Sequence, residues 1–357
     1  MNLSAINTVN RNTPHFKGWC ACPLDAIVIP RHDSITSEVK KICKEEGVKV
    51  IDRDNGPDDY PWTQDDITVA PNRKLFYNQC RKESNPDFIP SLAAQYGLQT
   101  VLTGPKICGG NMFFIKKGGE NILLIGEDDF QENSGLEKRY GVDKVIPLPQ
   151  MDAHLDLFMR PLKDTILIAD DTLMIANMIA AAKTIKKEFE SGKLSSAQKN
   201  AYKEIAIGLV SYLQYFHEPG NKEKFDEDRL KLKQISEILS KNGFNVKRVP
   251  GRIYSVNPDP EYYQTPRYVL NYLNAMAFEK KNGKIAYVTN ESNLDKKFGI
   301  TPEIAADIGF SFEKAFVDSL AGLVDKEDIH FVSGVSQMLF DHCGGIHCLY
   351  AEIPSER

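Results

Sequence analysis

The sequence lacks any apolar run close to the roughly 20 residues that a membrane-spanning helix needs. Residues 1–11 are polar and contain no apolar centre of a secretion signal. Basic residues are not in excess, since the net charge is -5, and nucleic-acid binders usually present a basic face. We therefore expect a cytoplasmic protein that binds neither nucleic acid nor membrane, although export as an effector without a cleavable signal stays open.

Cysteine is scarce, and the patterns that use it for structure are absent. The seven cysteines are scattered and odd in number, which indicates reduced thiols and no disulfide framework. Metal-ligand residue types gather at Asp341, His342, Cys343, His347 and Cys348, so a metal site is one interpretation of this segment. No second Cys-x-x-Cys or His-x₃-His pair completes a zinc cage, and no Asp-x-Asp-x-Asp-Gly calcium loop occurs. We expect no metal and no cofactor, with calcium left open but without a motif.

What the sequence does contain is a repeated pattern. An amphipathic, helix-like stretch, a break that is usually glycine, and a β-rich run recur at 39–52, 92–104, 136–149, 235–251 and, without the glycine, 320–334. Glycine after a helix is a common left-handed cap, and the alternating valine and isoleucine that follow favour a strand. The pattern predicts an α/β fold of five repeated modules; an ordinary α/β sheet remains the alternative.

One long segment interrupts the repeats. Residues 172–242 contain stretches with the apolar spacing of packed helices, from 174 to 191 and from 196 to 216. We interpret 172–242 as a helical insertion within a single catalytic domain that spans 1–357.

The chain ends in a reactive-looking motif, Gly344-Gly345-Ile346-His347-Cys348. Two glycines before a thiol leave little bulk around it, so a substrate can approach closely. We expect this segment to be a short apolar strand. Alternation would then put His347 and Cys348 on opposite faces, which makes His347 a poor base for its neighbour.

A better base lies in the middle of the chain. On a strand, His154 and Asp156 would share one face with Asp152. A carboxylate beside an imidazole holds its charge and orientation, as general acid–base catalysis requires. We therefore predict that His154 works with Cys348.

Two further polar clusters follow the first two repeats. Trp62-Thr63-Gln64-Asp65-Asp66 sets charge beside a large aromatic ring, where burial is costly unless a cation meets the carboxylate. Gly109-Gly110-Asn111 lets the backbone crowd a site, with Asn111 able to orient a neighbour; a plain tight turn explains this spacing equally well.

Taken in order, Trp62-Thr63-Gln64-Asp65, Gly109-Gly110-Asn111, His154-Leu155-Asp156 and Gly345-Ile346-His347-Cys348 resemble the motifs of the guanidino-group-modifying (pentein) superfamily, which includes the protein-arginine, arginine and agmatine deiminases. The resemblance implies a five-bladed α/β propeller of five ββαβ modules about a pseudo-fivefold axis, with the site at its centre. Two departures bear on substrate recognition: Cys108 replaces the acidic residue that some relatives carry before the glycine pair, and the insertion is larger than in compact members.

The resemblance also implies roles. Cys348 would be the nucleophile, His154 the acid and base, and Asp65 and Asp156 the carboxylates that clamp a guanidinium. Asn274, Trp62, Asn111 and Gly110 would lie at the substrate. A free amino acid also needs a cation for its carboxylate, for which Arg160, Arg252 and Arg267 are candidates. The implied partner is a guanidino small molecule or a protein arginine.

The implied reaction is hydrolytic deimination of arginine, peptidyl-arginine or an agmatine-like compound to a ureido product such as citrulline, through a covalent thiouronium on Cys348. An amidinotransferase or a dihydrolase on the same scaffold remains an alternative, as does a non-catalytic pentein binding module. The oligomeric state is left open.

Overall fold

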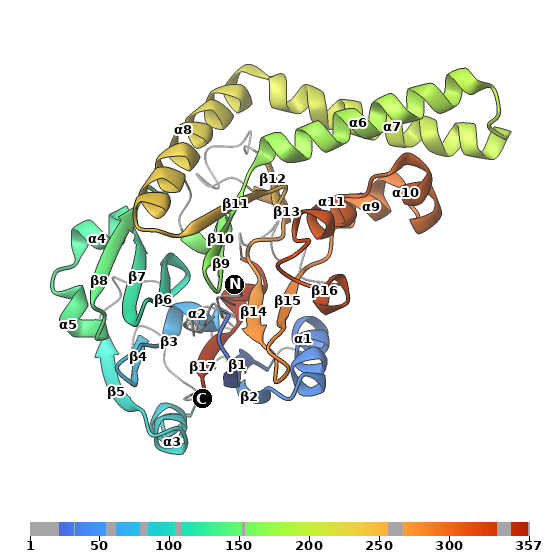
Figure 1. The fold of residues 1–357 in the computed structure, drawn as a ribbon. Coiled ribbons are helices and arrows are strands. Elements are labelled where there is room, and N and C mark those ends of the chain that lie inside the picture. Colours follow the sequence, from blue (N-terminus) through green and yellow to red (C-terminus); the bar gives the residue numbers. More distant parts are fainter. Residues whose placement is uncertain are drawn as a thin grey trace, which may run out of the picture.

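The computed structural model describes residues 21–31, 33–54, 62–78, 85–103, 109–151, 154–255, 267–333 and 344–355. Among these residues the strands form five three-stranded sheets and one two-stranded ribbon, a mixed α/β fold. Figure 1 shows the sheets grouped around the short helix α2 (Thr63–Asp66).

The five three-stranded sheets share one topology. In each, a first strand pairs antiparallel with a second, and the second pairs parallel with a third across a helical connection. The sheets are, in the order first, second and third strand: β3 (Ile67–Val69), β4 (Lys74–Asn78) and β5 (Gln99–Thr103); β6 (Met112–Lys117), β7 (Glu120–Gly126) and β8 (Lys144–Leu148); β9 (Met159–Leu162), β10 (Thr165–Ala169) and β11 (Asn245–Val249); β14 (Met276–Glu279), β15 (Ile285–Asn290) and β16 (Ile329–Val332); and β17 (Ala351–Pro354), β1 (Leu24–Pro30) and β2 (Lys49–Arg53).

The chain closes on itself through the last of these sheets. Its first strand, β17, comes from the carboxyl end of the chain, whereas β1 and β2 come from the amino end. Pro354 pairs with Leu24 and Ala351 with Val28. The final module is therefore assembled from both ends, which brings the segment just before β17 into the middle of the molecule (Figure 1).

Helices connect the second and third strand of each sheet, as the repeats predict. They are α1 (Asp33–Glu45), α3 (Phe88–Gln95), α4 (Glu127–Glu132) with α5 (Leu136–Tyr140), α6 (Asp171–Ser191) with α7 (Ser196–His217) and α8 (Pro219–Lys241), and α9 (Asn293–Phe298) with α10 (Pro302–Ile308) and α11 (Phe312–Ser319). The glycine breaks at Gly47, Gly97, Gly141 and Gly243 all have positive φ, between 60° and 76°. A residue with a Cβ is disfavoured in that conformation, which is why glycine recurs there.

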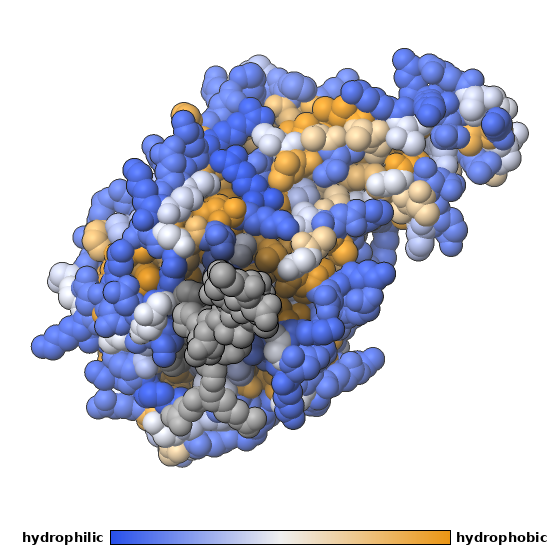
Figure 2. All heavy atoms as spheres, viewed as in Figure 1, coloured by the Kyte–Doolittle hydropathy of each residue, from blue (hydrophilic) through white to orange (hydrophobic). Residues whose placement is uncertain are grey.

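The segment 172–242 is made of α6, α7 and α8. Met174, Met178, Ala181 and Ile185 bury one stripe of α6, while Ser195 begins α7 with a capping box to Gln198. In Figure 1, α6 and α7 form a long arm at the edge of the molecule. The arm carries exposed apolar side chains, including Ile179, Ile207 and Val210, and Figure 2 shows hydrophobic patches over it.

A buried charge cluster ties this arm to the rest of the fold. The fully buried Arg252, on β12 (Arg252–Ser255), donates to Asp228 of α8 at 2.7 Å and to Asp171 of α6 at 3.4 Å. Lys224 of α8 also pairs with Asp228, and its ammonium donates to the Met151 carbonyl at 3.3 Å. Burial raises the pKa of Asp171 to about 6, against the opposing effect of Arg252.

Replacing Asp228 with asparagine should therefore destabilise the protein. Asp228→Asn removes the charge that balances Arg252 and Lys224, and loss of one partner of a buried ion pair costs about 3 kcal/mol. The matched control is Asp226→Asn, two residues away, whose half-exposed side chain pairs with Lys222 and Arg229 at the surface, so its loss should lower the urea midpoint much less. Equal urea midpoints for the two variants would contradict a stabilising role for the buried charge cluster.

Candidate active site

The polar residues singled out from the sequence lie in short turns that directly precede first strands. Helix α2 precedes β3, the turn η1 (Gly109–Asn111) precedes β6, and the turn η2 (Leu155–Leu157) precedes β9. Asn274 precedes β14, and the helical turn α13 (Ile346–Leu349) precedes β17. One topological position, used five times, thus carries every residue of the candidate site.

Cys348 lies in α13, a single helical turn, and not on the predicted strand. The strand prediction failed because Gly344 allows the chain to fold under Trp62: a Cβ on Gly344 would lie 2.5 Å from the Trp62 ring. In a helical turn, successive side chains do not point to opposite faces, so the argument that removed His347 from the site is wrong. His347 and Cys348 are both buried.

The Cys348 thiol is bordered by an amide and a carboxylate. Asn274 Nδ2 donates to Sγ at 3.2 Å, and Sγ donates to Asp156 Oδ2 at 3.6 Å. Burial, followed by the charges of Asp156 and Asp65, holds the pKa of Cys348 well above its ordinary value. In this state the sulfur is therefore a protonated thiol.

Asp156 is fully buried and reaches the thiol from η2. The sequence predicted a strand here, but residues 155–157 form a 3-10 turn. Even so, His154 and Asp156 approach the same point: a Cβ on Gly110 would lie 2.7 Å from His154 Nδ1 and 3.0 Å from Asp156 Oδ2. Asp152 lies outside the described residues.

The two oxygens of Asp156 have different surroundings. Oδ2 is 2.7 Å from His347 Nδ1 as well as near the thiol. Oδ1 is buried and has no hydrogen-bond partner in the described part of the chain. Burial and nearby Arg160 lower the pKa of His347, against the opposing effect of Asp156, so the imidazole is neutral and its Nδ1–H donates. A buried carboxylate oxygen without a donor favours a cationic ligand.

Asn111 holds the turn that carries Asp156. Its Oδ1 accepts from the Leu155 backbone at 3.2 Å, and its Nδ2 donates to Asp129 at 3.0 Å. Both ends of the amide are thus engaged by the protein. This arrangement favours a positioning role for Asn111 over the predicted contact with substrate.

Asp65 and Asp66 have different roles in α2. Asp66 is buried and pairs with the buried Arg53 at 2.9 Å. Asp65 is half-buried, and its charge acts on the Cys348 thiol. Asp65 is therefore the aspartate of this pair whose charge raises the pKa of the Cys348 thiol, and its contact with substrate stays a prediction.

Two of the three arginines considered for a substrate carboxylate make ion pairs within the protein. Arg160 is fully buried and donates to Glu352 at 3.0 Å and to the Tyr350 hydroxyl at 3.2 Å. Arg252 belongs to the charge cluster with Asp228. The Arg267 side chain lies outside the described residues. The substrate contact of Arg160 stays a prediction.

The sequence did not reveal two asparagines that support the site. Asn271 accepts from the Asn274 backbone at 3.1 Å and donates to the Leu157 carbonyl at 2.9 Å, so it joins the Asn274 turn to η2. Asn290 donates to the carbonyls of Asn271 and Asn274. The Asn-x-x-Asn spacing of residues 271 and 274 was the available signal for Asn271.

Among the described residues, no group of three or more histidine, cysteine, aspartate or glutamate side chains is arranged to hold a metal. No described helix is both long and apolar enough to cross a membrane. Asp341, His342 and Cys343 of the alternative metal interpretation lie outside the described residues.

No protein-family model matches the chain, and no curated protein matches it in sequence. Its structure is similar to the N-terminal domain of ArgZ bound covalently to a reaction intermediate, with 12% identity, a TM-score of 0.45, and coverage of 92% of this chain and 98% of that one. ArgZ is an arginine dihydrolase of the ornithine–ammonia cycle in cyanobacteria. A dimethylarginine dimethylaminohydrolase adduct with S-methyl-L-thiocitrulline has 10% identity, a TM-score of 0.42, and coverage of 92% and 99%.

At these identities and TM-scores the likeness does not decide the activity. We therefore derive the function from the geometry of the site alone.

Adding a methyl group at Gly110 should disable the site without unfolding the protein. Gly110→Ala pushes a Cβ against both His154 and Asp156, and displacing catalytic groups by about 1 Å costs roughly 100-fold in rate. The check is kcat/KM for guanidinium hydrolysis, the reaction proposed below. Gly220→Ala is the control, because a Cβ there meets nothing within 4 Å and the backbone φ is not positive. Unchanged turnover in Gly110→Ala would refute this geometry.

Proposed function

We propose that this protein hydrolyses a guanidinium group to a ureido group and ammonia, with Cys348 as the nucleophile. One observation carries the proposal: a buried thiol lies 3.6 Å from a buried carboxylate whose second oxygen, Asp156 Oδ1, has no donor among the described residues. A guanidinium supplies planar N–H donors to carboxylates and at the same time presents an electrophilic carbon.

Binding and activation are coupled in this scheme. Asp156 Oδ1 and Asp65 take the guanidinium N–H groups and fix its plane next to Cys348. The positive charge of the substrate offsets the two carboxylates that keep the thiol protonated. The thiol proton passes to His154, and the thiolate forms a bond to the guanidinium carbon.

Bond cleavage follows from the same groups. Protonated His154 gives its proton to the departing nitrogen, the C–N bond breaks, and ammonia leaves behind a thiouronium on Cys348. Neutral His154 then takes a proton from water, and the hydroxide adds to the carbon. As the new carbonyl forms, the C–S bond breaks, the sulfur leaves with the electron pair and takes up the hydroxyl proton as the Cys348 thiol, and His154 releases its extra proton to solvent. The ureido product is uncharged, so the two aspartates hold it less tightly than the substrate.

We further propose that the five sheets of common topology are the blades of a five-bladed propeller, with the whole chain as one catalytic unit and 172–242 as an insertion in it. The placement of every site residue just before a first strand supports this arrangement. A pseudo-fivefold relation between modules would bring those five turns together at one centre.

A ureido assay tests the reaction. Purified protein is incubated with arginine, agmatine or an arginine-containing peptide, with and without calcium, and ureido product and ammonia are measured. We expect equal amounts of both products from at least one substrate, and none from Cys348→Ser, which should remain folded because a hydroxyl replaces the thiol. Full activity in Cys348→Ser would refute the assignment of the nucleophile.

Asp65 and Asp66 provide a matched pair. Asp65→Asn should weaken guanidinium binding about 10- to 100-fold, the scale of one charge-assisted hydrogen bond. Asp66→Asn should lower the melting temperature, because it leaves the buried Arg53 without its carboxylate, and should change binding much less. Titration calorimetry in a Cys348→Ala background measures the affinity of each variant, and thermal unfolding measures its melting temperature. Comparable losses of affinity would mean that Asp65 is not the binding aspartate.

A further inference from the structure

His347 is the closest described partner of Asp156 and has no part in the reaction scheme above. Its Nδ1 lies 2.7 Å from Asp156 Oδ2, and the side chains of both residues are almost completely buried. We propose that His347 is a positioning residue: its Nδ1–H fixes the plane of the Asp156 carboxylate so that Oδ1 faces the substrate. This inference rests on the proposed function and assigns a role within the same site.

A carboxylate needs such a partner to act as a directional clamp. The terminal torsion of an aspartate is broad, so the plane of the carboxylate is set by hydrogen bonds and not by the side chain itself. With Oδ2 held by His347, the remaining oxygen has one direction in which to accept. Without that bond, the plane of the carboxylate could rotate, and its accepting oxygen would no longer face the substrate.

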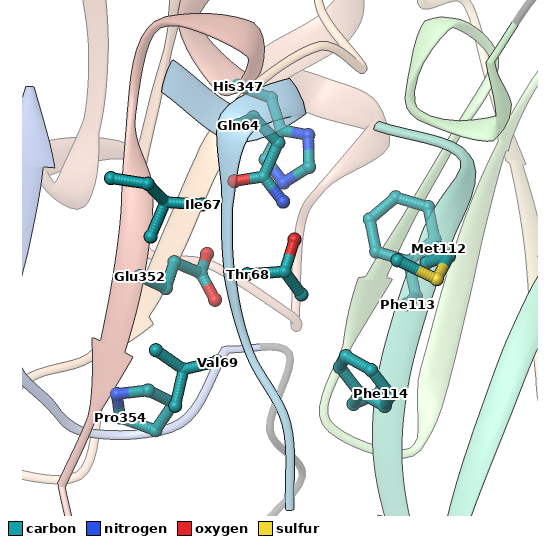
Figure 3. Close-up of a pocket in the computed structure, with 10 residues that line it drawn as sticks. All are labelled: Gln64, Ile67, Thr68, Val69, Met112, Phe113, Phe114, His347, Glu352 and Pro354. Atoms are coloured by element: carbon teal, nitrogen blue, oxygen red, sulfur yellow. The ribbon is translucent and has the colours of Figure 1, made fainter. Parts of the chain in front are cut away.

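The His347 ring is itself held from several sides. Its backbone N–H donates to Asn274 Oδ1 at 2.9 Å. Phe113 stacks on the ring with centroids 5.6 Å apart, and Tyr350 meets it edge-on at the same separation. Figure 3 shows the ring beside Gln64 at one end of a pocket whose walls include Phe113 and Glu352. A rigid donor in a packed environment can impose its geometry on a neighbour.

Asn274 links this donor to the nucleophile. Its Oδ1 accepts from the His347 backbone, and its Nδ2 donates to the Cys348 thiol. His347, Asp156, Cys348 and Asn274 therefore form a closed ring of contacts. A shift of His347 would therefore displace both the Asp156 carboxylate and the Cys348 sulfur.

Two substitutions separate the donor from the shape of the ring. His347→Phe keeps an aromatic ring but removes Nδ1–H, whereas His347→Asn carries an N–H near the position of Nδ1. We expect kcat/KM to fall about 100-fold in His347→Phe and to stay within about tenfold of wild type in His347→Asn. His330→Phe, on β16, is the matched histidine control.

The split between kcat and KM distinguishes positioning from a merely structural role. A carboxylate held in the wrong plane binds the guanidinium less tightly and orients it less well, so His347→Phe should raise KM and lower kcat while its melting temperature stays close to that of wild type. His347→Asn should keep both parameters within about tenfold of wild type, and His330→Phe should leave both unchanged. Equal losses in both His347 variants would overturn the inference.

A measurement without substrate keeps this test separate from that of the proposed function. In protein labelled with ¹⁵N-histidine, the Nδ1–H bonded to a buried carboxylate should give a slowly exchanging downfield proton signal that is lost in His347→Phe and in Asp156→Asn. If the signal is present but no guanidino compound is hydrolysed, the proposed function fails while the contact stands. If hydrolysis occurs and the signal is absent from wild type, the positioning role is wrong.

Discussion

The Asp156 carboxylate is fully buried, and moving such a charge out of water costs several kcal/mol unless polar partners compensate. The site is organised around that requirement. His347 donates to one oxygen, and Asn111 and Asn271 hold the turn from which the side chain projects. The other oxygen is left without a donor among the described residues. The protein thus stabilises the charge only in part. In the proposed reaction, a cationic substrate supplies the missing hydrogen bond to Oδ1.

The repeated topology is what makes this compensation feasible. Each polar group comes from a turn before a first strand, so no single segment has to supply a complete site. Asn274 connects two such turns, because it bonds to the thiol of α13 and is itself tied through Asn271 to the carbonyl next to Asp156. Closure of the last sheet by both chain ends fixes α13 relative to α2, where Trp62 packs on Gly344.

Local sequence signals were sufficient to predict the helix–glycine–strand modules. Gly47, Gly97, Gly141 and Gly243 have positive φ. The helix-like sequence before each glycine and the strand-like sequence after it predict this conformation. Such features depend on neighbours in sequence, so they can be predicted from it. In the fifth module the predicted helical stretch from Leu320 is wrong, because α11 ends at Ser319 and the turn that follows contains Gly322 with positive φ.

The conformation of the catalytic turns was not predictable in the same way. Residues 154–156 and 346–348 alternate in a manner that favours strands, yet helical turns form at 155–157 and 346–349. Contacts with distant groups accompany both turns: Asn111 binds the Leu155 backbone, and the Trp62 ring occupies the space beside Gly344. The same limit applies to Arg160, whose partner Glu352 lies far along the chain. Residue types pointed to the chemistry, but the roles of His347 and Arg160 follow only from contacts between segments remote in sequence.

The electrostatics of the site also bear on when the thiol becomes reactive. Burial and the charges of two carboxylates raise the pKa of Cys348 and keep it protonated, which protects it from alkylation and oxidation, since the thiolate is the reactive form. A cation bound between Asp65 and Asp156 offsets part of the negative charge that opposes ionisation of the sulfur. A neutral ligand of the same shape would not do so. In the proposed reaction, selectivity for a charged guanidinium therefore arises at the activation of the nucleophile as well as at binding, and both depend on the plane in which Asp156 is held.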